Sequence, residues 1–276
     1  MNQLLDLVLK SPLSDLSSYL NSTSPDLSTL FDQSSLTILH LCVANNKEPQ
    51  MRVILHHSKS LPKLAYNKWI NHQSREGYTA LLLAVSKGHF DCVKLLVQFD
   101  ADVYARTGLG LDVMHLCGQN NNALILSFFH ERNFPLCSID NKGGTCLHWA
   151  AYMGSFTVLG LLLALGVDKN VQDNDGRTPL HLAVISANEK VARKLLVYGA
   201  NPEIKDKRER LPIDNAVESN AIGLIKMLRP LNVLEIISCK NKVKEPEKNF
   251  KHLVGLTLFL AFAYVFIMVF CAKGNK

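Results

Sequence analysis

A spacing of 33 residues, repeated through the middle of the chain, constrains its fold more than any other feature. The copies begin TALLLA, DVMHLC, TCLHWA, TPLHLA and LPIDNA, at Thr79, Asp112, Thr145, Thr178 and Leu211. A further copy, TILHLC, begins at Thr37, 42 rather than 33 residues before Thr79. A unit of this length buries its apolar face only against its neighbours. The sequence therefore predicts a linear stack of similar units, with one side suited to binding partners.

The unit that begins at Thr178 predicts a pair of short helices. Asp175 and Gly176 form a tight turn, Thr178 is suited to cap a helix, and Pro179 suits the first helical turn. Apolar residues at helical spacing follow, and Gly199 suits the end of the second helix. The length and the T-P-L-H-x-A motif resemble the ankyrin repeat. The resemblance implies an all-α fold class, an ankyrin-repeat solenoid of about six repeats.

The remaining segments differ in composition from the repeats. Around residues 61–73 an insertion lengthens the first interval, and the last unit is polar enough to serve as a cap. The expected organisation has five parts, which are an N-terminal helical cap or worn repeat (1–36), the array (37–234), a basic linker (235–252), a transmembrane helix (253–272) and a short tail (273–276).

The transmembrane prediction depends on twenty consecutive uncharged residues, LVGLTLFLAFAYVFIMVFCA, from Leu253 to Ala272. As a helix they span about 30 Å, the thickness of the bilayer hydrocarbon core. A buried core helix is the alternative. The single span predicts an integral, single-pass membrane protein. Five lysines between 240 and 251 precede the segment, so the positive-inside rule predicts that the array is cytosolic. The expected location is an endomembrane, the ER or Golgi.

Charge elsewhere is almost balanced. The lysines of residues 240–276 account for most of the formal charge of +6. The array therefore lacks the basic face of a nucleic-acid binder, and the expected partners are proteins or extended peptides on its concave side, with membrane lipid at the C-terminal helix.

No catalytic residue, metal site or cofactor is predicted. The recurring histidines invite a zinc or Cys-His interpretation, but zinc ligands cluster at short spacings, whereas these follow the repeat. We expect them to satisfy buried polar groups between units. The residues assigned to the structural repeat motif are His40, His115, His148, His181, Thr145, Thr178 and Pro179.

The order of parts resembles the N-terminal region of the ankyrin-bearing DHHC palmitoyltransferases. The segments GGTCLHWAAYMG, GRTPLHLAVISAN and ERLPIDNA are similar to the last three repeats of that family, ahead of its first membrane helix. The catalytic Asp-His-His-Cys motif of those enzymes does not occur in this sequence. The resemblance implies a substrate-recruiting array without the catalyst, so that the chain as given is not an enzyme.

That resemblance also implies a peptide-binding pair of residues, Trp149 and Asn120, for which packing and loop-filling roles are the alternatives. Cys239, near the expected span, is a possible S-acylation site, with an unmodified thiol as the alternative. The predicted function is a membrane-anchored ankyrin scaffold that recruits protein partners. The alternative is a truncated or partial palmitoyltransferase whose array recruits substrates for protein S-acylation.

Overall fold

The computed structural model describes residues 2–23, 27 and 34–229, and every regular element in this part is an α-helix. The helices are α1 (Asn2–Lys10), α2 (Leu13–Thr23), α3 (Ile38–Ala44), α4 (Glu48–Ser58), α5 (Lys63–Ile70), α6 (Ala80–Lys87), α7 (Phe90–Gln98), α8 (Val113–Asn120), α9 (Ala123–His130), α10 (Cys146–Met153), α11 (Phe156–Ala164), α12 (Pro179–Ile185), α13 (Glu189–Val197), α14 (Pro212–Glu218) and α15 (Ile222–Leu228).

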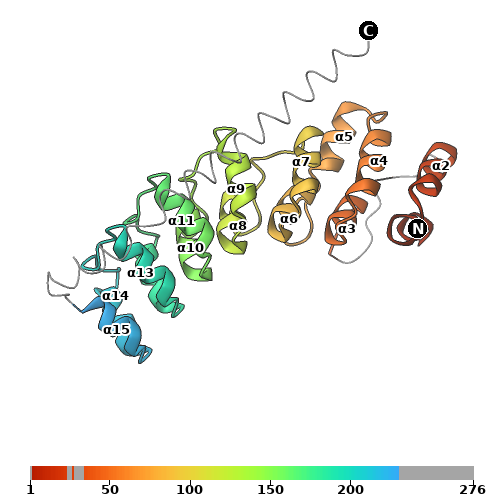
Figure 1. The fold of residues 1–276 in the computed structure, drawn as a ribbon. Coiled ribbons are helices and arrows are strands. Elements are labelled where there is room, and N and C mark those ends of the chain that lie inside the picture. Colours follow the sequence, from red (N-terminus) through yellow and green to blue (C-terminus); the bar gives the residue numbers. More distant parts are fainter. Residues whose placement is uncertain (1, 24–26, 28–33, 230–276) are drawn as a thin grey trace, which may run out of the picture. The chain divides into compact units, whose positions relative to one another are not determined.

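Six helical hairpins follow one another in chain order (Figure 1). The first helices, α3, α6, α8, α10, α12 and α14, pack in one layer, and the second helices, α4, α7, α9, α11, α13 and α15, pack in the other. Helix α5 lies within the predicted insertion, and α1 and α2 pack against the first hairpin. We number these hairpins one to six.

Capping residues fix where the first helices begin. Thr178 has an extended backbone, and its hydroxyl accepts a hydrogen bond from the His181 N–H. Pro179 follows at a position where its missing N–H costs no hydrogen bond. At the other end, Gly154 caps α10 with φ at 73°, and a Cβ there would lie 2.7 Å from Asn188 Oδ1. Local sequence thus sets the helix limits and the close approach of neighbouring hairpins.

The core is continuous between the layers and between the hairpins. Leu147 and Ala150 on α10, and Leu180 and Ala183 on α12, are fully buried in this core. Each buried leucine contributes about 1.5–3 kcal/mol relative to an exposed one. Every hairpin therefore depends on its neighbours for stability, as the repeat predicts.

The prediction of a C-terminal single transmembrane helix is corrected, together with the single-pass membrane localisation. Within the part of the chain that the structure describes, no helix is long and apolar enough to cross a bilayer. The longest helices there have 11 residues, about 16 Å, against about 30 Å of hydrocarbon. The segments 253–272, 235–252 and 273–276 lie outside the described residues. The architecture that the structure supports is an all-α solenoid.

Candidate functional site

The recurring histidines lie on the first helices of hairpins one, three, four and five, and each contacts the following hairpin. His148 Nδ1 lies 3.0 Å from the Thr145 hydroxyl, and its Nε2 lies 3.0 Å from the carbonyl of Arg177 in the next hairpin. His181 makes the same contacts with Thr178 and with the Arg210 carbonyl, at 2.9 and 3.2 Å. Burial lowers the pKa of both histidines. A neutral imidazole that accepts at Nδ1 and donates at Nε2 satisfies both neighbours.

The other two recurring histidines, His40 and His115, differ in the group that contacts Nδ1. His40 makes the same two contacts with the Thr37 hydroxyl and the Tyr78 carbonyl, both at 2.9 Å. His115 lies opposite a carboxylate, that of Asp112, instead of a hydroxyl. No group of three His, Cys, Asp or Glu side chains within the described part of the chain is placed to hold a metal ion. The histidines are separated along the stack and do not converge.

Asn120 and Trp149, the expected peptide-binding pair, each form a hydrogen bond with a different residue and not with each other. The exposed Asn120 side chain donates to the Leu116 carbonyl of its own helix, at 3.0 Å. The half-buried Trp149 donates its indole N–H to Asp140 Oδ2, at 2.8 Å. Neither contact links one residue to the other. The structure places both on first helices, Asn120 at the end of α8 and Trp149 within α10.

Trp149 substitutes for an arginine that the next two hairpins use. The turns before the first helices, which we call fingers, carry Asp140, Asp173 and Asp206 at equivalent positions. Arg177 donates to Asp173, and Arg210 to Asp206, each four residues on, but the residue four after Asp140 is Gly144. The Trp149 indole N–H donates instead to Asp140 Oδ2, the equivalent of the oxygens that accept from Arg177 and Arg210.

We define the first-helix face as the exposed side of the first helices together with the fingers. In hairpins four and five it carries Tyr152, Met153 and Ile185, whose side chains are 44%, 45% and 39% exposed. The equivalent positions in hairpins two and three hold Ser86, Lys87, Gln119 and Asn120. At these positions of the first helices the face is therefore polar in hairpins two and three and apolar in the fourth and fifth. We call Tyr152, Met153 and Ile185 the apolar stripe.

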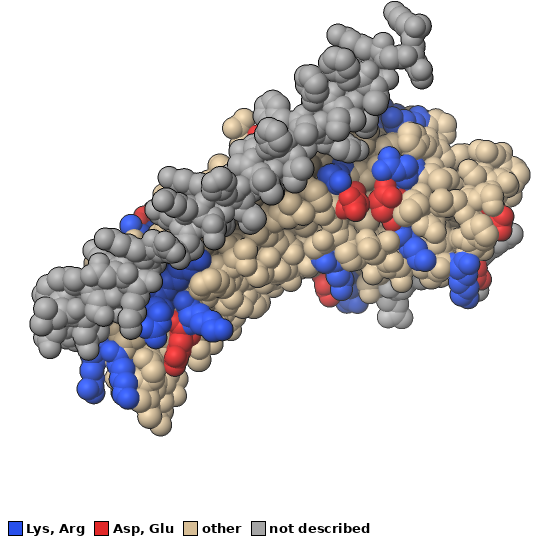
Figure 2. All heavy atoms as spheres, viewed as in Figure 1, with Lys and Arg blue, Asp and Glu red and all other residues tan. Residues whose placement is uncertain are grey.

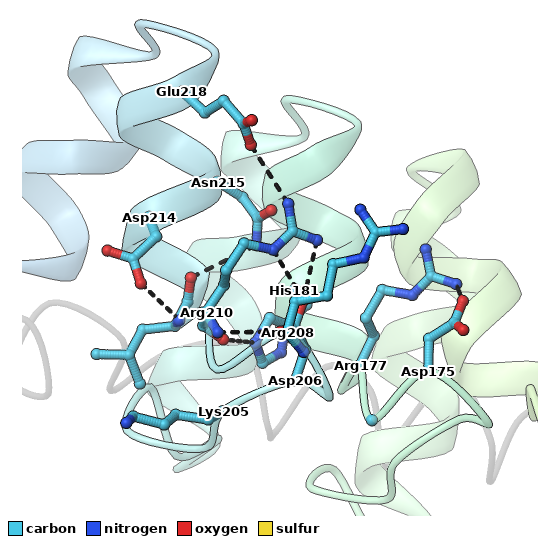
Figure 3. Close-up of polar contacts among 12 residues, drawn as sticks. Asp175, Arg177, His181, Lys205, Asp206, Arg208, Arg210, Asp214, Asn215 and Glu218 are labelled. Carbon is cyan, nitrogen blue, oxygen red and sulfur yellow. Dashed lines mark hydrogen bonds and ion pairs between the residues drawn. The ribbon is translucent and has the colours of Figure 1, made fainter.

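A small cavity of about 100 Å³ lies between the fifth and sixth fingers (Figure 3). Its lining is charged, with Asp175, Arg177, Asp206, Lys207, Arg208 and Arg210. Burial alone would raise the pKa of Asp206, but hydrogen bonds from the backbone N–H groups of Arg210 and Arg208, and the Arg210 guanidinium, lower it instead. This site was not predicted from the sequence, because nothing in the repeat pattern shows that charged residues of two successive turns face each other.

A larger cavity, of about 260 Å³, lies between the second helices α4 and α7. Figure 2 shows basic and acidic side chains together there. Arg52 pairs with Glu48 and Lys94 with Asp91, so these charges satisfy each other. This cavity offers no surplus charge to a ligand.

Four of the cysteines, Cys42, Cys92, Cys117 and Cys146, are free and buried, and Cys137 is free and exposed. Burial raises the pKa of Cys92 to about 11, which keeps its thiol protonated at neutral pH. Cys239 lies outside the described residues, so its S-acylation stays a prediction.

Two family models match the chain, one for ankyrin repeats in three copies over residues 13–107 and one for ankyrin repeats in many copies over residues 147–196. The leucine-rich repeat serine/threonine-protein kinase 1 of Caenorhabditis elegans is 35% identical over 95 residues, 34% of this chain and 4% of the kinase. The nuclear factor NF-kappa-B p105 subunit of Gallus gallus is 30% identical over 150 residues, 53% of this chain and 15% of that protein. The p105 subunit of Mus musculus is 31% identical over 150 residues.

The matched region is a small part of each relative, and the expected resemblance to the DHHC palmitoyltransferases is not shown. What the relatives share with this chain is the repeat, whose stacked form is a protein-interaction scaffold. The matched stretches, residues 13–107 and 147–196, together with the helical hairpins that the structure describes across them, show that this chain contains ankyrin repeats.

Proposed function

We propose that the chain binds a protein partner through the first-helix face of hairpins four to six. The observation that carries the proposal is the apolar stripe of Tyr152, Met153 and Ile185. Burying the exposed part of each side chain contributes about 1 kcal/mol to binding. Polar residues occupy the same positions in hairpins two and three, so the repeat itself does not require apolar groups there.

Trp149 belongs to the same surface. It lies on α10, one helical turn before Tyr152 and Met153, and its ring is partly exposed while its N–H is held by Asp140. A large aromatic group with a fixed orientation loses little entropy on binding, which is typical of residues that dominate interfaces. In this proposal Trp149 contacts the partner segment. Asn120, at the end of α8, would contact the part of that segment that extends toward hairpin three.

The test is a selection of random 12-residue peptides displayed on phage, with the full chain as the target. Peptides that bind the wild-type chain are then measured against the triple variant Tyr152→Ser, Met153→Ser, Ile185→Ser. The matched control is Leu124→Ser with Ile222→Ser, which removes two apolar side chains, each 60% exposed, from second helices. The proposal expects weak binding by the triple variant and unchanged binding by the control.

A separate measurement assigns Trp149. Trp149→Ala should weaken the selected peptides at least as much as any single change in the stripe, and Asn120→Ala should weaken them less. Equal affinity for wild-type chain and Trp149→Ala would remove Trp149 from the binding surface. Selected peptides that bind the triple variant as tightly as the wild type would refute the proposed function.

A further inference from the structure

The cavity between the fifth and sixth fingers is built from two adjacent turns that are joined through their backbones. Lys207 N–H donates to the Asp175 carbonyl at 2.9 Å, which fixes the sixth finger against the fifth. Within the sixth finger, Asp206 Oδ1 accepts from the N–H groups of Arg208 and Arg210, at 2.8 and 3.0 Å. The position of the basic side chains around the cavity is therefore set by a hydrogen-bonded backbone.

Two of the four basic residues at the cavity are already paired. Arg177 contacts Asp173, at 3.2 Å, and Asp175. Arg210 contacts Asp206 at 3.0 Å and Glu218 at 3.4 Å. These pairs use the carboxylates of Asp175 and Asp206, the acidic residues that line the cavity. Each of these arginines thus contacts two carboxylates, and contributes structure and no surplus positive charge to the site.

Lys207 and Arg208 provide the surplus charge. Both are exposed, and no acidic side chain of the described residues lies within ion-pair distance of either. Figure 3 shows the Arg208 side chain extending from the finger, with none of the drawn interactions ending on its guanidinium. The six residues that line the cavity, four basic and two acidic, therefore sum to a charge of +2. Asp173 and Glu218 pair with Arg177 and Arg210 from outside this lining and bring the wider cluster to neutrality. A single carboxylate or a pair of carboxylates would complete it.

Only the sixth finger has basic residues at both of these positions. In the fourth and fifth fingers the residues equivalent to Lys207 are Asn141 and Asn174, and those equivalent to Arg208 are Lys142 and Asp175. In the second finger Arg75 stands at the Lys207 position, but Glu76 follows it. The fourth finger has Gly144 where the fifth and sixth have Arg177 and Arg210. An acidic group consequently has one preferred place along the array.

The cavity opens on the same face as the apolar stripe. Arg210, which lines the cavity, forms an ion pair with Glu218. In hairpin six Glu218 occupies the repeat position that Tyr152 and Ile185 occupy in hairpins four and five. Packed helices lie about 8–10 Å apart, and an extended chain advances about 3.3–3.6 Å per residue. One hairpin thus corresponds to about three residues of an extended partner.

Resting on the proposed function, we propose that the partner segment combines apolar residues with an acidic residue about three to six positions away, which binds Lys207 and Arg208. The apolar residues contact the stripe in hairpins four and five. The carboxylate enters the cavity between the fifth and sixth fingers. A nucleic acid fits less well, because its binding gains come from neutralising many phosphates and this site has two surplus charges.

The same peptide selection tests this inference, with the charge-reversed variant Lys207→Glu, Arg208→Glu as a second target. The matched control is Lys190→Glu, Arg193→Glu, which makes the same charge change at exposed positions of α13. Wild-type chain should select peptides rich in Asp or Glu at the stated distance from apolar residues. The charge-reversed variant should bind them about ten-fold more weakly and select Lys or Arg there instead. Affinity for wild-type chain should fall as salt rises.

Selected peptides that lack acidic residues, yet lose affinity for the Tyr152, Met153, Ile185 triple variant, would overturn this inference and leave the proposed function standing. Equal binding of acidic peptides by the charge-reversed variant would overturn it as well. Binding of a single-stranded RNA probe that depends on Lys207 and Arg208, without enrichment of acidic peptides, would assign the cavity to nucleic acid. The salt dependence is measured on the wild-type chain alone, so misfolding of a variant cannot affect it.

Discussion

Asp112 Oδ1 lies 2.8 Å from His115 Nδ1, and the opposite nitrogen of that ring, Nε2, lies 3.0 Å from the Gly144 carbonyl. A carbonyl only accepts, so Nε2 carries hydrogen, and an ionised carboxylate also only accepts. The contact between Asp112 and His115 therefore requires a further proton between the two atoms. In hairpins one, four and five a threonine hydroxyl supplies the hydrogen, as Thr145 does for His148. The third hairpin thus holds a buried carboxylate–imidazole pair where those three hold a hydroxyl–imidazole pair.

Replacing this aspartate with the residue of its neighbours should be tolerated. Asp112→Thr supplies a hydroxyl to His115 and removes a buried carboxylate, so we expect an equal or greater free energy of unfolding in urea. Asp112→Ala leaves His115 Nδ1 and two backbone N–H groups, those of Met114 and His115, without their acceptor, and should cost about 1–3 kcal/mol. A Thr variant as unstable as the Ala variant would contradict this interpretation.

The described array should lose stability in mild acid. Burial lowers the pKa of His148 and His181 in the folded chain. Below about pH 6.5 the unfolded state therefore binds more protons than the folded state, and the free energy of unfolding falls by up to about 1.4 kcal/mol per pH unit for each histidine. The stability is fully present above that pH and decreases between about pH 6.5 and 5. Urea titrations over this range measure it.

The double variant His148→Asn, His181→Asn is the control for the acid effect. It should be less stable than the wild type at pH 7.5, because the ring nitrogens no longer bridge the hairpins. Its stability should change less with pH. Asp112 and Asp206 have lowered pKa values, so their contribution is present above about pH 4 and disappears below it. A wild-type stability that stays constant from pH 7.5 to 5 is incompatible with this account.

The Trp149–Asp140 contact predicts a rescue between two positions. Trp149→Phe removes the donor to the buried Asp140 Oδ2 and should destabilise the chain by about 1–3 kcal/mol. Adding Gly144→Arg places an arginine where Arg177 and Arg210 stand in the next hairpins, each bonded to its own aspartate. We expect the double variant to recover most of the loss in thermal unfolding. Additive destabilisation by the two changes would show that the arginine does not reach Asp140.

Gly118 should be intolerant of a methyl group. A Cβ at this position would lie 2.5 Å from the Cys146 carbonyl, at the contact between α8 and α10. Gly118→Ala must separate the two helices, and overpacking of this kind costs about 1–3 kcal/mol. The matched control is Gly108→Ala, whose Cβ would lie 3.5 Å from the nearest atom, the Glu76 carbonyl. Equal urea midpoints for the two variants would contradict the close packing.

The period of 33 residues was sufficient to predict the hairpins, because it fixes the capping threonines and the left-handed Gly154, Gly166 and Gly199. It was insufficient for contacts between units. The run Gln119–Asn122 resembled loop filler, yet Asn121 accepts from Val158 N–H in the next hairpin, and Asn122 donates to Val85 in the previous one. Such contacts depend on which side chains of different units face each other.

The candidate site was predictable only in part for the same reason. The sequence singled out Trp149 and Asn120 as a pair, but the side chain that Trp149 contacts is Asp140, in the turn before its own helix α10. The surplus charge of Lys207 and Arg208 emerges only after Arg177 and Arg210 are matched to their own carboxylates. The composition of the array is almost neutral, and that average conceals the charge of +2 on the residues that line this one cavity.

Hydrogen–deuterium exchange of the full chain, with and without the tightest selected peptide, tests the central claim most directly. The first-helix face of hairpins four to six should exchange more slowly on binding, in α10, α12 and the fingers 173–177 and 206–210. The second helices α11 and α13 should exchange at unchanged rates. Slower exchange confined to those second helices, with the first helices and fingers unaffected, would contradict the account.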